Sequence, residues 1–181
     1  MRTAFWIVPA SLLFLTLPDR GTGQGKGGIE VQEIRYPALQ EMVLKNRGKV
    51  VVVDFWATWC VPCIRNFPHM LEMQKKFGKD GLVSISVSID KVDTKTDKDD
   101  TPAKRTERVR KLLEKLGSTI PNVILDEPQK LVDEKLRISS IPCIYVFNRQ
   151  GKWTKFGGDE DSVVRPPEVE KLVVELLREK P

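Results

Sequence analysis

The sequence has few of the residues that staple small secreted modules or build metal sites. Its 181 residues include three cysteines, Cys60, Cys63 and Cys143, and one histidine, His69. Three cysteines are too few for the disulfide framework of a small extracellular module, and a structural zinc site normally has four Cys or His ligands. His69 lies six residues past Cys63 on an expected helix, which favours an ordinary solvated or hydrogen-bonded histidine over a ligand. We therefore expect no metal and no cofactor, and any thiol chemistry to be local.

The sequence also lacks a basic stripe interleaved with aromatic residues. It has 30 Lys+Arg against 25 Asp+Glu, a formal net charge of +5, and the two signs are interspersed. The excess positive charge is therefore interpreted as favouring solubility, and no nucleic-acid partner is predicted. A hydrophobic content of 40% in a chain of this length suits one compact domain with its own core.

No hydrophobic run reaches the roughly 20 residues that a spanning helix needs. The longest is the mostly apolar stretch 4–17, which follows Met1-Arg2 and precedes a glycine-rich segment. This pattern predicts a signal peptide or short N-terminal anchor plus a glycine-rich linker over residues 1–28. We therefore expect an exported protein, either periplasmic or tethered to the outer face of the inner membrane; cleavage and retention of the segment both stay open.

From residue 29 onward the pattern alternates between strand and helix. Residues 49–56, K-V-V-V-V-D-F-W, form a continuous apolar run, as expected for a strand buried on both faces. A helix is predicted over 61–77, ended by Gly78, and residues 82–90 alternate as a second strand. This strand, helix and strand predict a parallel crossover. Before them, the pattern predicts a strand at 29–35 and a helix at 37–46 with Gly48 as its cap.

The second half of the chain continues the alternation. Its segment 91–100 is dense in charge, but it lacks the glycine and terminal glutamate of an EF-hand loop, so we interpret it as a solvated loop. The elements predicted after it are a helix over 102–116 closed by Gly117, strands at 122–126, 141–147 and 152–158, a helix at 129–136 and a final helix from Pro167. This order predicts an α/β fold with a central sheet and helices on both faces.

Two cysteines separated by two residues can close a small disulfide, bind zinc or carry haem. Haem attachment needs a histidine directly after the second cysteine, and this chain has Ile64 there. A cysteine at the first turn of a helix faces free backbone N–H groups that stabilise a thiolate. Redox chemistry is therefore favoured over two inert buried cysteines, with Cys60 as the nucleophile and Cys63 as the resolving thiol. Pro62 fits the first helical turn without losing a hydrogen bond.

The stretch V-D-F-W-A-T-W-C-V-P-C resembles the active-site signature of the thioredoxin superfamily. Across residues 29–181 the chain is most similar to the exported TlpA-like and ResA-like branch, thiol-disulfide oxidoreductases of the bacterial envelope. Pro68 matches the proline of the family's active-site helix, and S-S-I-P-C-I-Y-V-F matches its cis-proline segment. The resemblance implies a thioredoxin-like fold with a central mixed β-sheet in a domain at 29–181.

The resemblance also implies roles for individual residues. Pro142 would be the cis-proline, and Asp54 would lie buried beneath the cysteines and relay protons to and from Cys63. Ile141 would offer its backbone to an extended substrate segment. The remaining residues expected at the substrate-binding surface are Trp59, Pro62 and Gly157.

Two departures from the family pattern bear on function. The dipeptide between the cysteines, Val61-Pro62, has no histidine to hold the thiolate, which favours a reductant. Cys143 stands where the family more often has threonine, and it is a third redox thiol, a soft-metal ligand or, as we favour, a small apolar strand residue. A thioredoxin-fold protein that binds Cu(I) through Cys60, Cys63 and Cys143 is the alternative function.

Partners follow from the resemblance. They would be disulfide-containing envelope proteins, with apocytochrome c as a candidate, and an electron donor that is membrane-bound or of thioredoxin type.

Overall fold

The computed structural model describes residues 28–91 and 98–179. The predicted N-terminal segment and most of the predicted charged loop lie outside these residues. The strands are β1 (Gln32–Ile34), β2 (Val50–Trp56), β3 (Leu82–Ser88), β4 (Asn122–Leu125), β5 (Cys143–Phe147) and β6 (Trp153–Gly157). The helices are α1 (Tyr36–Leu44), α2 (Val61–Phe77), the short 3-10 turn η1 (Gly78–Asp80), α3 (Pro102–Leu116), α4 (Gln129–Leu136) and α5 (Pro166–Arg178).

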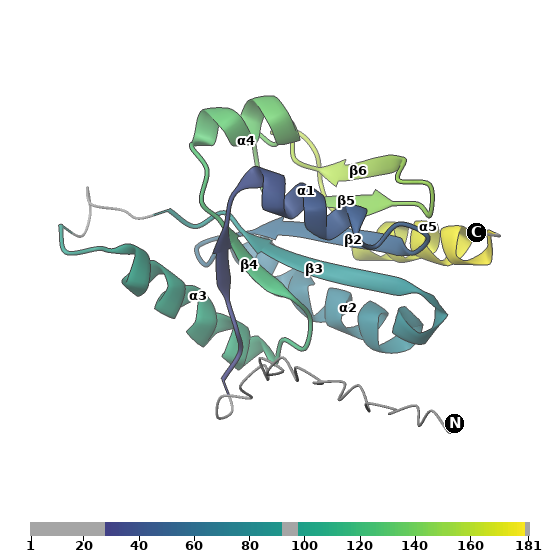
Figure 1. Ribbon diagram of the computed structural model, residues 1–181, viewed down its shortest axis with the longest axis horizontal. Helices are drawn as coiled ribbons and strands as arrows, with labels where there is room; N and C mark the ends of the chain where they lie inside the picture. The colour runs from purple at the N-terminus through teal and green to yellow at the C-terminus, as the bar shows by residue number, and fades with distance from the viewer. Residues whose placement is uncertain (1–27, 92–97, 180–181) are drawn as a thin grey trace, which may run out of the picture.

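The six strands form one mixed sheet in the order β1-β4-β3-β2-β5-β6 (Figure 1). The pairs β1·β4, β4·β3 and β3·β2 are parallel, whereas β2·β5 and β5·β6 are antiparallel. The parallel pairing of β2 with β3 across α2 confirms the predicted crossover. The mixed sheet with helices on both faces confirms the predicted fold class.

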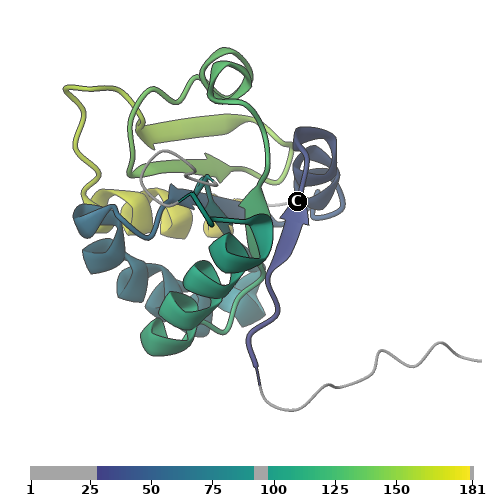
Figure 2. The ribbon, with the colours of Figure 1, turned by 90° about the vertical axis from the view of Figure 1, so that its left-hand side faces the viewer.

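Right-handed crossovers decide which helices share a face of the sheet. The chain passes from β2 through α2 to β3 and then through α3 to β4, moving in one direction along the sheet, so both helices lie on the same face. The step from β1 through α1 to β2 runs the other way and places α1 on the opposite face. Figure 2 shows α2, α3 and α5 gathered on one side of the sheet and α1 on the other.

Strand β2 is the centre of the core. All seven of its residues are buried, with α2 and α5 on one face of the sheet and α1 on the other (Figure 2). Trp56 packs its ring against Phe67 of α2, with 5.4 Å between the ring centroids. Phe55 contacts Tyr145 of β5 on the opposite face at 6.0 Å. Since side chains alternate along a strand, Asp54 shares the α2 face with Trp56.

Contacts between α2 and α5 hold the cysteine-bearing helix in place. The His69 Nε2 atom of α2 lies 3.3 Å from the Glu170 Oε2 atom of α5, and the Lys76 Nζ atom lies 2.9 Å from the other oxygen of that carboxylate. His69 therefore lies beside a carboxylate of α5.

Two expected boundaries differ from the structure. The sequence pattern places the cap of the first helix at Gly48, which is wrong, because α1 ends at Leu44 and Lys45 closes it in a right-handed conformation. Gly48 instead adopts φ 86° in the turn before β2 and donates its N–H to the Arg149 carbonyl. The first strand is also shorter than the predicted 29–35, because β1 is an edge strand with only three residues paired to β4.

Candidate redox site

The two neighbouring cysteines form a disulfide at the start of α2. Cys60 is the N-cap residue of the helix, and the backbone N–H of Cys63 donates to its sulfur over 3.3 Å. Pro62 occupies the first turn, as predicted. Cys60 is 5% exposed and Cys63 1% exposed, so the N-cap cysteine is the more accessible of two largely buried residues. The Cys60 sulfur therefore meets the positive end of a 17-residue helix.

The chain around the disulfide presents apolar side chains to solvent. Trp59 is 67% exposed and Val61 62% exposed, and Pro62 between the cysteines is also exposed. Large apolar residues directly beside a reactive group are typical of a surface that another molecule covers.

The carboxyl group of Asp54 is buried on the α2 face of β2. Asp54 is 3% exposed, and desolvation raises its pKa from 3.8 to about 7. At neutral pH such a group is divided between its protonated and deprotonated forms, whereas an aspartate in water is almost entirely deprotonated. The strand carries Asp54 on the face that α2 covers, and α2 begins just after β2 with the two cysteines.

Pro142 lies at the same edge of the sheet, where β2 ends. The Ile141–Pro142 peptide bond is cis. Cys143, the next residue, pairs with Phe55 of β2, so the β2·β5 ladder stops beside Pro142 and Ile141 lies outside it. The Pro142 carbonyl accepts a hydrogen bond from the Gly158 N–H over 3.2 Å.

The neighbouring strand approaches Pro142 so closely that only glycine fits there. A Cβ atom on Gly157 would lie 2.4 Å from the Pro142 carbonyl oxygen, and the residue has φ 71°. Both the close approach and the left-handed backbone exclude a side chain. Gly157 therefore lies against Pro142.

Cys143 lies apart from the disulfide chemistry. It is fully buried, and burial raises the pKa of its thiol to about 12. Because Cys143 is paired with Phe55, its side chain shares the sheet face of Phe55 and Tyr145, opposite the face that Asp54 and α2 occupy. A thiol held protonated on the far face suits the small apolar strand residue that we favoured.

The copper alternative would need several ligands gathered at one place in the described part of the chain. Among residues 28–91 and 98–179, no three His, Cys, Asp or Glu side chains come together in a way that could hold a metal ion.

In the same part of the chain, no helix has the length and apolar character needed to cross a membrane.

Sequence reasoning missed the residue that fixes the loop before Cys60. Asp90, just after β3, is buried, and its Oδ2 atom accepts hydrogen bonds from the Thr58 N–H over 2.9 Å and the Ser88 hydroxyl over 2.7 Å. Its Oδ1 atom accepts from the Thr58 hydroxyl over 2.5 Å. The signal available was an aspartate at the carboxyl end of a buried strand, where functional side chains of parallel sheets gather.

Asp90→Asn should loosen this loop. The amide retains one acceptor oxygen and adds an NH₂ group that cannot accept from Thr58, so buried donors lose their partner. We expect the free energy of unfolding to fall by about 1–3 kcal/mol and the alkylation rate of reduced Cys60 to change with it. Urea denaturation and iodoacetamide kinetics measure both effects, with exposed Asp80→Asn as the matched control. Equal behaviour of the two variants would contradict this role of Asp90.

Comparisons with known proteins agree with this geometry. Residues 32–155, more than half of the chain, match the model of the AhpC/TSA family. The chain is 29% identical over 111 residues to the thiol-disulfide oxidoreductase ResA of Bacillus subtilis (strain 168), a match that covers 60% of this chain and 52% of that protein. The chain thus spans about half the length of the curated relatives it matches.

Solved structures show the same fold. The thioredoxin domain of a thiol-disulfide oxidoreductase from Bacteroides vulgatus matches with a TM-score of 0.59 at 24% identity, covering 75% of this chain and 84% of that one. A thiol:disulfide interchange protein of the thioredoxin family from Chlorobium tepidum TLS matches with a TM-score of 0.54 at 20% identity, covering 74% and 83%. The predicted thioredoxin-like fold is confirmed.

Proposed function

The chain belongs to the AhpC/TSA family, and from this membership and its helix-terminal cysteine pair we propose that it is a thiol-disulfide oxidoreductase that reduces protein disulfides. The observation that carries the proposal is the position of the Cys60 sulfur as the N-cap of α2, with the Cys63 N–H directed at it. In the reduced protein the same N–H and the helix dipole stabilise a thiolate on Cys60.

The proposed reaction starts from the reduced dithiol. The Cys60 thiolate attacks one sulfur of a substrate disulfide, forms a mixed disulfide and displaces the other substrate sulfur as a thiolate. Cys63 then loses its proton and attacks the Cys60 sulfur, which releases the second substrate thiol. The chain is left with the Cys60–Cys63 disulfide of the present structure, and an electron donor must return two electrons to it.

We assign the proton transfer in the second step to Asp54. With its pKa raised to about 7, this carboxylate accepts the Cys63 proton as the thiol attacks and gives it up again afterwards. Its location on the face of β2 covered by α2 supports the assignment.

We place the substrate at the edge of the sheet beside Pro142. Ile141 precedes the β2·β5 ladder, so its backbone can pair with an extended substrate segment as an added strand does. Gly157 lets β6 approach Pro142 closely, because a side chain there would clash with the Pro142 carbonyl oxygen. The exposed Trp59 and Pro62, which are neighbours of the cysteines in the chain, would cover the docked segment.

A turnover assay tests the proposed function. With dithiothreitol as the electron source, the protein should accelerate the reduction of insulin disulfides in proportion to its concentration. The copper alternative makes the opposite prediction: purified protein would retain one copper ion per chain and leave insulin reduction at the background rate.

The proposal also covers the redox direction of the reaction and its place in the cell. We favour a reductant because Val61-Pro62 contributes no histidine to stabilise the reduced form. The substrates would be disulfide-containing proteins of the cell envelope, apocytochrome c among them, and the electrons would come from a membrane-bound or thioredoxin-type donor. The redox domain would be residues 29–181.

Export of the protein is tested through its first 28 residues. A fusion of residues 1–28 to alkaline phosphatase, which becomes active only outside the cytoplasm, should be active in a bacterial host. The apolar stretch 4–17 is the physical reason. Leu13→Arg in this stretch should abolish the activity. A fusion that stays inactive although it accumulates to normal levels would contradict export.

A further inference from the structure

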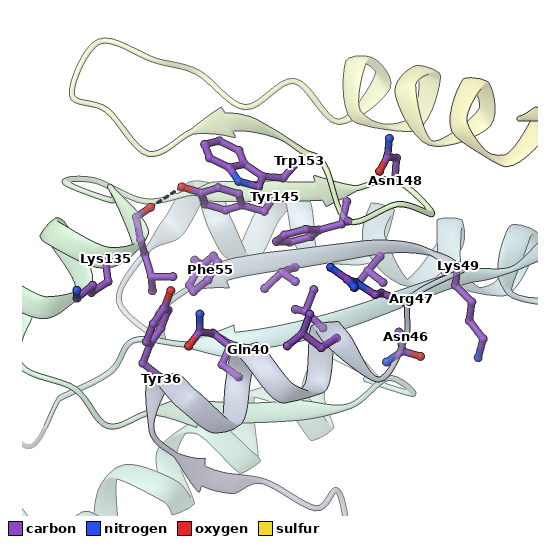
Figure 3. A pocket seen from close by; sticks show the side chains of 18 of the residues that line it. Tyr36, Gln40, Asn46, Arg47, Lys49, Phe55, Lys135, Tyr145, Asn148 and Trp153 are labelled. Atoms are coloured by element: carbon purple, nitrogen blue, oxygen red, sulfur yellow. Dashed lines mark hydrogen bonds between the residues drawn. The ribbon is translucent and has the colours of Figure 1, made fainter. Parts of the chain in front are cut away.

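Two large apolar side chains are exposed on the face of the sheet that α1 covers. Leu44, the last residue of α1, is 54% exposed, and Trp153, the first residue of β6, is 49% exposed. Both line a cavity bounded by α1, β2, β5 and β6 (Figure 3). The β2 residues beneath this cavity are buried, so the surface open to another molecule is the rim that carries Leu44 and Trp153.

Arg47 connects the two exposed side chains. Its backbone N–H donates to the Leu44 carbonyl over 3.1 Å. Its Nε atom would lie 3.6 Å from a Cβ atom on Gly151, two residues before Trp153, so the guanidinium rests against the turn between β5 and β6. Figure 3 shows the Arg47 side chain extending over the cavity. Leu44, Arg47 and Trp153 thus form one surface, which we call the α1–β6 face.

Positive charge predominates around the α1–β6 face. Five exposed cations line or border it, and none forms an ion pair within the part of the chain that the structure describes: Arg47, Lys49, Lys135, Arg137 and Lys152. No acidic residue lines the cavity, and Glu41 of α1 is paired with Lys45. The exposed Asp80 and Glu179 follow α2 and α5, the helices of the opposite face. The α1–β6 face is therefore suited to an anionic partner.

The α1–β6 face lies away from the disulfide. Trp153 pairs with Phe147, whose partner in β2 is Val51, near the start of that strand. Gly157, which lies against Pro142, is four residue steps further along β6, about 13 Å away. A partner docked on the α1–β6 face therefore leaves the edge of the sheet beside Pro142 open.

We propose that the α1–β6 face docks on an anionic phospholipid membrane, with Leu44 and Trp153 among the headgroups and the surrounding cations against lipid phosphates. Tryptophan is enriched at membrane–water interfaces because its ring is amphipathic. Three of the five cations are lysines, which are depleted in protein–protein interfaces, so the composition favours a lipid surface over an acidic protein. The inference concerns the folded domain and is independent of the proposed redox function.

Binding of the full chain to phospholipid vesicles tests the proposal. Because the apolar stretch 4–17 could itself enter a bilayer, the test compares variants in which that stretch is unchanged. On vesicles rich in phosphatidylglycerol, Arg47→Gln and Lys152→Gln should each weaken binding about fivefold in a sedimentation assay. Lys171→Gln removes the same charge from an exposed position on α5, on the opposite face, and should leave binding unchanged. On pure phosphatidylcholine all three variants should match the wild type.

Quenching of tryptophan fluorescence by brominated phospholipid shows which part of the domain meets the bilayer. Trp153→Phe should lose part of the quenching seen with the wild type. Trp59→Phe removes the exposed tryptophan beside the disulfide and should lose none. Thermal melting confirms that each variant is folded.

Two results would overturn the proposal: equal losses of quenching in Trp153→Phe and Trp59→Phe, or vesicle affinities of Arg47→Gln and Lys152→Gln that equal that of Lys171→Gln. Arg47-dependent binding of polyglutamate without Arg47-dependent binding of vesicles would also overturn it, because the occupant would then be an acidic protein.

Discussion

Cys63→Ser is expected to accumulate a covalent mixed disulfide between Cys60 and a substrate protein, whereas Cys60→Ser should form none and lose all insulin reduction. The reason is the order of the two attacks. Cys60 is the N-cap of α2 and is the more exposed of the two cysteines, so its sulfur should make the first bond to substrate. Without Cys63 no thiol is placed to resolve that bond.

Non-reducing gel electrophoresis and mass spectrometry after acid quenching measure the adducts. Cys143→Ser is the matched control, because this thiol is buried on the opposite face of the sheet and protonated. It should reduce insulin at the wild-type rate. If adducts accumulate in Cys60→Ser and are absent from Cys63→Ser, the assigned roles are reversed.

Asp54→Asn is expected to make the oxidised protein more stable at neutral and alkaline pH, and not at pH below 4. The pKa of Asp54 is 3.8 in its unperturbed state and about 7 in the fold. Between these values the folded state holds a proton that the unfolded state has lost, so wild-type stability falls as pH rises through this window. The loss amounts to roughly 4 kcal/mol by about pH 7 and stays constant above it.

Asparagine does not titrate, so the variant escapes this loss. Urea denaturation from pH 3.5 to 8.5 should show the two proteins converging in acid and separating by up to roughly 4 kcal/mol above pH 7. The exposed Asp80→Asn variant should follow the wild type. A separation that does not change with pH would mean that Asp54 does not titrate in this range.

Asp54→Asn should also slow catalysis. General-base assistance by a positioned carboxylate contributes about 10²-fold or more to a proton transfer. We therefore expect the resolution of the mixed disulfide by Cys63 to slow by about 10²-fold, while alkylation of Cys60 by iodoacetamide is little changed. In the wild type the rate of this resolution step should rise with pH through about 7, and the rise should be absent from Asp54→Asn.

The elements that sequence patterns predicted best are those with unambiguous local signals. The apolar run of β2 is buried on both faces, and α3 begins at Pro102 and ends before Gly117 in a left-handed cap, as predicted. The prediction of a helix cap at Gly48 was wrong because a glycine near a helix end is equally suited to the turn that follows. The length of β1 was overestimated because it depends on how many residues of β4 the strand can pair with.

The site was predictable where its residues are neighbours in sequence or carry a family motif. The cysteine pair and Asp54 lie within ten residues of one another, and Pro142 belongs to a recognisable segment. The hydrogen bonds from Thr58 to Asp90 join residues 32 positions apart, and no local sequence pattern predicts them. The face on which Cys143 lies depends on the register of β5 against β2, which the sequence of neither strand shows.

The reduction potential of the Cys60–Cys63 disulfide tests the central claim most directly. Equilibration of the protein with defined ratios of reduced and oxidised dithiothreitol or glutathione, followed by alkylation and mass spectrometry, measures it. As a reductant whose thiolate is stabilised by the helix terminus alone, the protein should have a potential between about −200 and −300 mV. A potential near about −120 mV, typical of a strong oxidant, would contradict the account.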